Sequence, residues 1–394
     1  MKRDLAQHIF EDLKEKMVFL GGPRQVGKTT LAKQMSQEFF DPFEYLNWDI
    51  PGDQKRILDF SFSPSSKLLL FDEIHKYKNW KNLIKGLYDG FGDQYRVLVT
   101  GSARLDLYRK GGDSMLGRYH YHRLHPISYA EAAGYSDQFS AVHFETKGEL
   151  IFCESKPQIL QDLMEFGGFP EPFLKKNKRT LRRWQNERKI RLIREDIRDA
   201  ESIRELSLLQ VLTNILPERV GTIFSLNSLR EDLKVAHRTL SKWIEILENF
   251  YFCYRIYPYN SSRIKSLKKE PKLYLWDYSE VPDEAERFEN LIASHLLKFV
   301  HHLYDTYGLR LDLCYLRDID QREVDFLITL ENRPLIAVEV KWKNQRISTP
   351  LKYFRAKLNI PYSYQVLRED GIDLFKHKEG VYLISADRFL TGLV

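Results

Sequence analysis

The stretch MVFLGGPRQVGKTTLAKQM, residues 17–35, decides how the chain begins to fold. A short apolar run leads into a glycine-bounded loop, and a segment with the apolar spacing of an amphipathic helix follows. Gly22 to Thr29 has the spacing G-x-x-x-x-G-K-[ST]. In such a loop the backbone N–H groups face a phosphate, and the start of the helix adds a favourable dipole. The stretch therefore predicts a strand, a phosphate-binding loop and a helix of an α/β domain.

The residue types of this loop indicate what it binds. Lys28 reaches the β- and γ-phosphates of a nucleotide, and the Thr29 hydroxyl ligates Mg²⁺. A chance match would lack the strand before the loop and the helix after it. The expected cofactors are ATP and Mg²⁺. The predicted nucleotide-binding residues of the loop are Gly22, Pro23, Arg24, Gln25, Val26, Gly27, Lys28, Thr29 and Thr30.

Two later segments agree with this interpretation. The run KLLLFDEIHK reads as a buried parallel strand that ends in two acids, and ligands bind at the carboxyl ends of such strands. Asp72 would hold magnesium through water, and Glu73 would orient and deprotonate the attacking water. The alternative is an exposed acid pair at a strand end. A third strand, in YRVLVTGSARL, ends with small polar residues, of which Ser102, or alternatively Thr100, would sense the γ-phosphate.

The phosphate loop, the DEIHK acids and VTGSARLDL together resemble an AAA+ ATPase. They are similar in particular to a widespread prokaryotic family whose C-terminal part is a domain of unknown function, and the resemblance extends over the whole chain. It implies ATP hydrolysis with Lys28 and Glu73 as catalytic residues. It also implies that Arg118, which follows Gly117, completes the site of a neighbouring copy by self-association. The alternative is that Arg118 is solvated or senses phosphate in its own chain.

Length and composition restrict the class of protein. A chain of 394 residues is too long for one ordinary core and predicts two or three domains. With 43% apolar and 29% charged residues it is a globular protein, and its net charge of +6 suits a nucleic-acid partner without requiring one. Three dispersed cysteines predict a reduced compartment. The charged N-terminus and the lack of any apolar run of ~20 residues predict a cytoplasmic protein with no membrane partner.

The middle of the chain carries two further patterns. Residues 136–200 are expected to form a helical lid or linker, with ten basic residues against one acid between Lys175 and Arg194. Such a run is either a solvated helix face or a surface that contacts phosphates. Residues 201–270 have the pattern of a winged helix, with two short helices and a β-prone run, and the basic stretch 261–272 as wing or linker. The second helix would present Arg238, Ser241 and Lys242 to DNA; the alternative is a structural lid or a protein dock.

The stretch REVDFLITLENRPLIAVEVKWK, residues 322–343, places charged residues in two strand-like runs. A hairpin between the runs would bring Asp325 beside Glu339, and a divalent cation would relieve the repulsion between the two carboxylates. Lys341 would then position a water or neutralise charge in the transition state. An amphipathic helix upstream places Glu289 where it would complete the metal shell. Glu289, Asp325 and Glu339 are therefore the predicted ligands of Mg²⁺ or Mn²⁺.

A helix Glu, a strand Asp and a Glu-x-Lys strand resemble the PD-(D/E)xK nucleases. The resemblance implies that Asp325, Glu339 and Lys341 are catalytic, although Val324 stands where the family has its proline. The predicted fold class is α/β, with an AAA+ ATPase domain over residues 1–135 and a nuclease-like domain over residues 271–394. The leading hypothesis is an ATPase coupled to a metal-dependent, DNA-interacting nuclease-like domain. The alternative is a nucleotide-switched DNA- or protein-binding protein whose nuclease-like domain is inactive.

Overall fold

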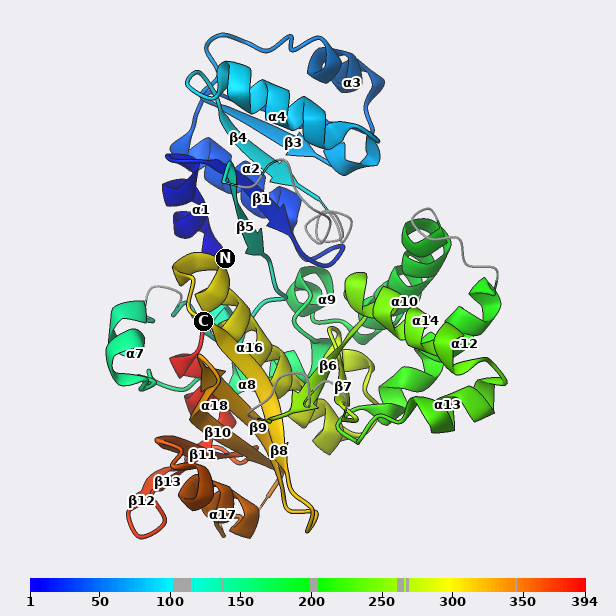
Figure 1. Ribbon diagram of the computed structural model, residues 1–394. Coiled ribbons are helices and arrows are strands. Elements are labelled where there is room, and N and C mark those ends of the chain that lie inside the picture. Colours follow the sequence, from blue (N-terminus) through cyan, green and yellow to red (C-terminus); the bar gives the residue numbers. More distant parts are fainter. Residues whose placement is uncertain are drawn as a thin grey trace. The chain divides into compact units, whose positions relative to one another are not determined.

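The computed structural model describes residues 1–101, 115, 117–135, 138–198, 205–260, 266, 269–343 and 346–394. The chain forms two compact units, Met1–Pro126 and Ile127–Val394, which are drawn in Figure 1. The first unit thus ends before residue 135, the end expected for the ATPase domain. The boundaries expected after residues 200 and 270 both fall inside the second unit.

A parallel sheet of five strands, in the order β2-β3-β4-β1-β5, forms the centre of the first unit. The strands are β1 Met17–Gly21, β2 Phe43–Asn47, β3 Leu68–Asp72, β4 Arg96–Thr100 and β5 Tyr119–Arg123. β1 and β3 are buried along their whole length, which explains their unbroken apolar sequences. Because β4 lies between β1 and β3, Thr100 at its carboxyl end is paired with Leu20 on one side and Asp72 on the other.

Helices cover this sheet. They are α1 Leu5–Leu13, α2 Lys28–Phe39, α3 Pro51–Leu58 and α4 Trp80–Phe91, with a 3-10 turn η1 at Ile74–Lys76. Met17 and Phe19 of β1 belong to a buried cluster that includes Trp80 of α4. Val18 and Leu20 alternate with them and are also fully buried, and helices α1 and α2 contact β1, β3 and β4. Both faces of the parallel sheet are therefore shielded from water, as this sheet type requires.

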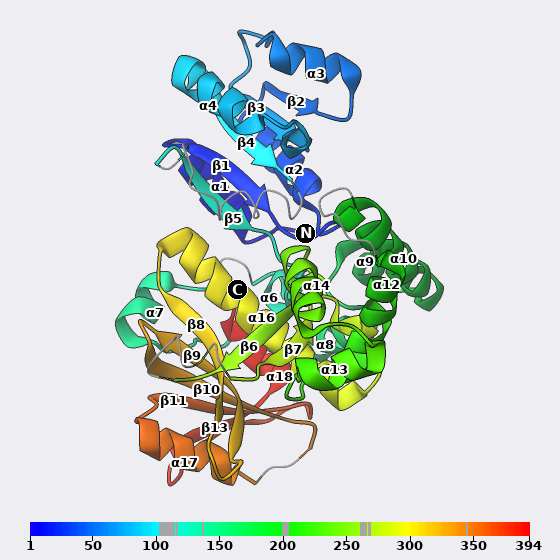
Figure 2. The ribbon, with the colours of Figure 1, turned by 45° about the vertical axis from the view of Figure 1, so that its right-hand side comes forward.

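The second unit contains an eight-stranded mixed sheet in the order β12-β13-β11-β10-β9-β8-β6-β7. Its strands are β6 Cys253–Pro258, β7 Lys272–Leu275, β8 Leu311–Arg317, β9 Glu323–Leu330, β10 Arg333–Lys341, β11 Tyr362–Leu367, β12 Asp373–Lys376 and β13 Val381–Ser385. β6 pairs with β7 in the antiparallel sense and with β8 in the parallel sense, so the sheet runs on without a break (Figure 2). A division at residue 270 would separate β6 from its neighbour β7.

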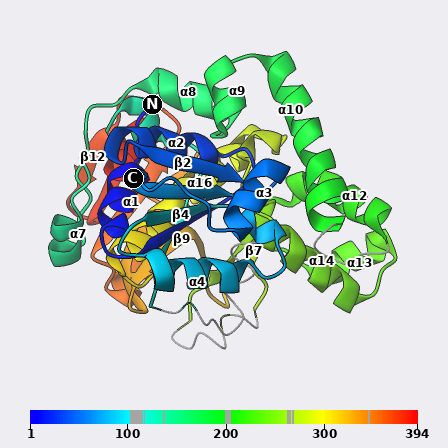
Figure 3. The same ribbon diagram turned by 90° about the horizontal axis from the view of Figure 1, so that it is seen from above.

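Some helices of the second unit pack against this sheet, and others form a group beside it. They are α6 Tyr129–Ala133, α7 Ala141–Lys147, α8 Pro157–Phe166, α9 Pro170–Lys175, α10 Lys178–Arg191, η2 Leu192–Ile197, α12 Leu206–Ile215, η3 Leu216–Arg219, α13 Leu226–Leu233, α14 His237–Asn249, η4 Tyr278–Glu280, α16 Glu284–Tyr307, α17 Thr349–Leu358, α18 Ala386–Phe389 and η5 Leu390–Gly392. α16 contacts β7, β8 and β10, and α17 contacts β9 and β10. α10, α12, α13 and α14 gather together at one side of the unit (Figure 3). In the part of the chain that the structure describes, no helix has both the length and the apolar character needed to cross a bilayer.

Candidate functional site

The phosphate loop between β1 and α2 has a backbone that only glycine adopts easily at two positions. Gly22 has a φ of 137°, and a Cβ there would lie 2.4 Å from the carbonyl oxygen of Leu124. Gly27 has a φ of 98° and forms the left-handed N-cap of α2. Both values lie in the region that side chains with a Cβ rarely enter. The two glycines of the motif are therefore required by the shape of the loop.

Lys28 lies inside this loop. Its Nζ donates hydrogen bonds to the carbonyl oxygens of Gly22 at 3.0 Å and Pro23 at 2.7 Å. The side chain is buried, so its charge acts in a medium of low polarity. A loop that curls around an ammonium at a helix N-terminus attracts phosphate oxygens.

The Asp72 carboxylate, at the carboxyl end of β3, accepts hydrogen bonds from three hydroxyls. Thr29 Oγ1 and Tyr45 OH each lie 2.9 Å from Oδ2, and Thr100 Oγ1 lies 2.6 Å from Oδ1. The predicted Mg²⁺ residues Thr29 and Asp72 are thus adjacent, and their hard oxygen atoms are the ligand type that Mg²⁺ takes. Tyr45 was not among the predicted site residues, and no local pattern in the sequence marks it. Thr100 was predicted only as the alternative to Ser102 for sensing the γ-phosphate, a role that stays a prediction.

Glu73 follows Asp72 in a left-handed conformation, with a φ of 56°. Its N–H donates to the carbonyl oxygen of Thr100 at 3.1 Å, and its Oε2 lies 3.4 Å from Lys76 Nζ. Burial raises the pKa of Glu73 above its ordinary value, although the Lys76 ammonium opposes the shift. A strained backbone and a raised carboxyl pKa beside a phosphate loop are features of a general base.

The structure places Arg118 at the amino end of the parallel strands, whereas the phosphate loop follows their carboxyl end. Arg118 precedes β5, its carbonyl oxygen accepts from the N–H of Met17 at the start of β1, and its guanidinium pairs with Asp89 at 2.8 Å. The phosphate loop follows the other end of β1. The phosphate-sensing role of Arg118 in its own chain and its role in a neighbouring copy both stay predictions. Ser102 lies outside the described residues.

The hairpin of β9 and β10 brings the later carboxylates together. Glu331 and Asn332 form the tight turn with φ values of 49° and 65°, and Val338 lies opposite Phe326. The same register places Asp325 opposite Glu339, as the sequence predicts. Asp325 Oδ2 also accepts from the N–H of Val340 at 2.8 Å, and Lys341 Nζ lies 2.8 Å from Glu339 Oε1.

A lysine that was not among the predicted site residues lies among these acids. Lys272 Nζ is 3.4 Å from Glu289 Oε1, 3.5 Å from Asp325 Oδ1 and 2.7 Å from Glu323 Oε1. The side chain is only 3% exposed. Burial disfavours its ammonium, but the charges of Glu289 and Asp325 outweigh burial and raise the pKa of Lys272. The predicted helix Glu and strand Asp therefore meet around an ammonium.

This arrangement does not support the predicted metal shell of Glu289, Asp325 and Glu339, which stays a prediction. Among the described residues, no three His, Cys, Asp or Glu side chains are grouped so that they could hold a metal ion. The physical reason is that Lys272 neutralises Glu289 and Asp325, and Lys341 neutralises Glu339. Burial, followed by the Asp325 charge, raises the pKa of both Glu289 and Glu339 to about 7. In this conformation the donor set does not fit a divalent cation.

The helix pair α13–α14 follows the predicted pattern. Leu229 and Leu233 of α13 are buried, and so are Leu240, Trp243 and Leu247 of α14. Three residues, 234–236, connect the two helices. A bridge joins Ile223 to Lys272 of β7, which in turn pairs with β6. Two helices and a small three-part sheet thus form one module of the second unit.

On this module, the three predicted nucleic-acid residues lie along one side of α14. Arg238 and Lys242 are exposed, and Ser241 is half-buried. They alternate with the buried residues of the helix at the expected spacing. The arrangement leaves both basic side chains accessible to a polyanion.

The basic run on α10 divides into two groups. Several members have acidic partners, including Lys178 with Glu165 at 3.0 Å and Lys189 with Glu280 at 2.6 Å. By contrast, within the described part of the chain no acidic side chain forms an ion pair with the exposed Arg179, Arg182 or Arg183. These three lie on the face of α10 opposite the buried Leu181 and Trp184.

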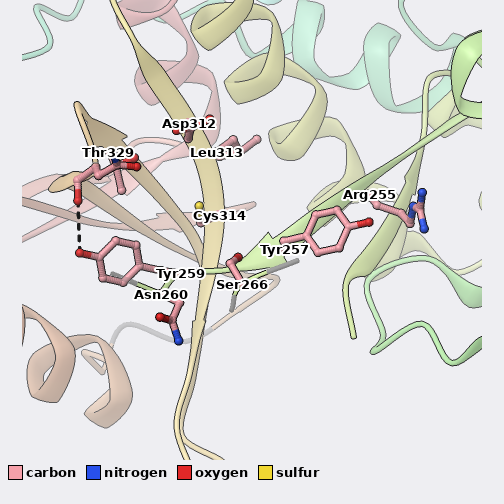
Figure 4. A pocket seen from close by; sticks show the side chains of 10 residues that line it. Arg255, Tyr257, Tyr259, Asn260, Ser266, Asp312, Leu313, Cys314 and Thr329 are labelled. Carbon is pink, nitrogen blue, oxygen red and sulfur yellow. Dashed lines mark hydrogen bonds between the residues drawn. The ribbon is translucent and has the colours of Figure 1, made fainter. Parts of the chain in front are cut away.

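A cavity of about 110 Å³ lies between β6 and β8, where Figure 4 shows its lining side chains. Tyr257 and Tyr259 contribute from β6 and the residue after it, and Cys314 contributes from β8. Tyr259 OH donates to the carbonyl oxygen of Asn332 at 3.2 Å. No residue of the predicted sites is among the described residues that line this cavity.

Comparisons with known families match three successive ranges of the chain. Residues 14–133 match the model of a family described as AAA domain. Residues 157–280 match one described as Domain of unknown function (DUF8612), and residues 286–389 match one described as Domain of unknown function (DUF4143). The predicted AAA-type ATPase domain is thus confirmed. The winged-helix and nuclease-like identities stay predictions.

Similar proteins are themselves uncharacterized. An uncharacterized protein of Methanocaldococcus jannaschii is 27% identical over 82% of this chain and 74% of its own length. One of Mycobacterium tuberculosis is 23% identical over 99% of this chain and 85% of its own length. Among solved structures, a variant of Thermotoga maritima RuvB has a TM-score of 0.32 and 18% identity, covering 65% of this chain and 89% of that chain. Aeropyrum pernix ORC1 in complex with DNA has a TM-score of 0.32 and 13% identity, covering 73% and 90%.

Proposed function

We propose that the chain is an ATP-hydrolysing, nucleotide-switched protein that binds DNA with its second unit. The observation that carries the ATPase function is the convergence of Thr29 and Thr100 on Asp72, with Glu73 next in the chain. Lys28 supplies the phosphate-facing charge at the loop. Thr29 and Asp72 would hold Mg²⁺, which stabilises charge on the phosphates when bound. Glu73 accepts a proton from the attacking water.

Two substitutions test the ATPase. Lys28→Ala should abolish nucleotide binding, because the loop loses its buried ammonium. Glu73→Gln should bind ATP normally and fail to turn it over, because an amide does not accept the proton. The matched control is Glu38→Gln, an exposed carboxylate on α2, which should change neither property. Nucleotide binding is measured by calorimetry and turnover by phosphate release. Normal turnover by Glu73→Gln would remove the assignment.

DNA binding is supported by the exposed basic side of α14. Arg238 and Lys242 carry two positive charges on a helix whose other side is buried, which is how a recognition helix is presented to a groove or a phosphate backbone. We interpret the module as a winged helix. The double substitution Arg238→Ala with Lys242→Ala should weaken duplex binding and flatten its dependence on salt. Lys147→Ala combined with Lys378→Ala, at two exposed lysines of the same unit, is the charge-matched control.

The carboxylate cluster favours holding DNA over cutting it in this conformation. Lys272 and Lys341 neutralise the acids that a nuclease would need for metal binding. Metal-dependent cleavage is the second candidate, and the placement of Asp325 opposite Glu339 favours it. Incubation with duplex DNA and Mg²⁺ or Mn²⁺ separates the two. If the wild type cuts DNA and both Asp325→Ala and Lys341→Ala abolish the cutting, cleavage replaces binding as the proposed function. Equal cutting by the wild type and both variants would indicate a contaminating nuclease.

A further inference from the structure

Lys272 places a buried positive charge among the acids of the carboxylate cluster. Its ammonium is in contact with acids from three places in the chain: Glu289 on α16, and Glu323 and Asp325 on β9. Tyr274, two residues along β7, donates to Glu289 Oε1 at 2.7 Å. Groups of β7 therefore contact both Glu289 and Asp325, and an unpaired ammonium in so buried a place would be strongly disfavoured.

The backbone of Lys272 is held on both sides. On one side it pairs with Ile256 of β6, and on the other a bridge joins it to Ile223. The segment around Ile223 also touches the acids: a Cβ on Gly221 would lie 3.4 Å from Glu289 Oε1. Gly221 has a φ of 74°, so glycine suits this position for two reasons. The segment that leads into α13 thus holds both the strand of Lys272 and one of its acids.

We propose that the Lys272 ammonium stands in place of a divalent cation, and that a cation enters the cluster only when Lys272 is withdrawn or removed. The inference rests on the proposed function, in which the second unit binds DNA without cutting it in this conformation. A divalent cation between Glu289 and Asp325 would lie close to the ammonium, and like charges at this distance repel strongly where water is excluded.

Mn²⁺ titration of the full-length protein without nucleotide tests the proposal, with free Mn²⁺ followed by electron paramagnetic resonance. In the wild type the cluster should contribute no Mn²⁺ binding, so Asp325→Asn should leave the Mn²⁺ affinity of the protein unchanged. Lys272→Met should create a site that binds Mn²⁺ at least about tenfold more tightly, since the acids lose their internal cation. Adding Asp325→Asn to Lys272→Met should remove that site again. Lys272→Arg keeps the charge and should behave as the wild type.

Two outcomes would overturn the proposal. One is tight Mn²⁺ binding by the wild type that Asp325→Asn abolishes, because the cluster would then accept a cation beside Lys272. The other is no gain in a folded Lys272→Met protein. Should that variant fail to fold, Lys272→Met with Glu323→Gln restores the charge balance and must show the same gain. The Arg238 and Lys242 variants report on DNA binding alone, so failure of the proposed function is recognised separately.

Discussion

Buried carboxyl groups of the second unit differ in how their charge is compensated. Glu280 is 3% exposed and lies 2.6 Å from Lys189 Nζ, while Asp277 lies close enough to add a repelling charge. Burial, followed by the Asp277 charge, raises the pKa of Glu280 from 4.5 to about 7. A folded-state pKa above the unfolded one means that the folded protein holds its proton more tightly. This residue therefore makes the folding stability of the unit depend on pH.

The sign of that dependence can be tested. Glu280 contributes stability below pH 4.5 and loses it as the pH rises to about 7, a contribution of about 3 kcal/mol in the free energy of unfolding. Glu280→Gln should make this slope smaller by the Glu280 contribution, because an amide does not titrate, while Glu289 and Glu339 keep theirs. The readout is the change of the unfolding free energy with pH, measured by urea unfolding at several pH values. The absolute stability is not used, because the substitution also removes the ion pair with Lys189. The exposed Glu187→Gln should keep the wild-type slope, and an unchanged slope in Glu280→Gln would disprove the assignment.

Residue identities were predictable from the sequence where a local motif fixed them. Gly22, Lys28 and Thr29 follow from a spacing within one loop, and Asp72 follows from the end of an apolar strand. Lys272 did not follow, because it closes a stretch that reads as a basic wing or linker. Its partners are Glu289, Glu323 and Asp325, and only the pairing of β7 with β6 brings them together. Contacts of this kind depend on the whole sheet.

At the scale of elements, α10 shows how a basic helix can be partly neutral. Arg182 and Arg183 are exposed without an acidic partner in the described residues, whereas Lys178 of the same helix pairs with Glu165. Lys175, the last residue of the preceding helix α9, pairs with Glu171 at 2.8 Å. An arginine without an acid keeps its fork of donors for phosphate oxygens. A lysine that already has an acidic partner gains less from a phosphate.

This difference predicts unequal effects on DNA binding. Replacing Arg182 and Arg183 by Ala should weaken duplex binding and reduce the slope of log K against log salt by about two, if each contacts one phosphate. Replacing Lys175 and Lys178 by Ala removes the same charge and should have a smaller effect. Fluorescence anisotropy between low and moderate salt measures both. Equal losses would show that α10 acts only through net charge.

Elements themselves were predicted well where their pattern is local. The apolar spacing of 226–247 predicted α13 and α14, and the alternation of 323–341 predicted the β9–β10 hairpin. The segment 221–224 was missed, because its single bridge at Ile223 leaves no periodic pattern. Arg118 was placed by analogy with a neighbour's site, and only the strand order showed which edge of the sheet it occupies.

At the scale of the whole molecule, the division after Pro126 is the one along which the chain should separate. Fragments 1–126 and 127–394 each contain a complete sheet and should unfold cooperatively in urea. A fragment of 271–394 starts at β7 but lacks β6, its hydrogen-bonded neighbour, and should show no cooperative transition. Circular dichroism follows all three. Cooperative unfolding of 271–394 at the midpoint of 127–394 would instead support the predicted domain boundary at residue 270.

The continuity of β6 and β7 with the larger sheet also bears on how such chains diversify. A helix pair joined by a linker can be exchanged between genes as a unit, because nothing else in the protein depends on its backbone. Here the same hairpin both completes the helix pair and supplies Lys272 to the acids of α16 and β9. Recombination would have to carry the helix pair, the β6–β7 hairpin and the acids of α16 and β9 together. These segments should therefore be inherited as one block, and their sequences should change in a correlated way.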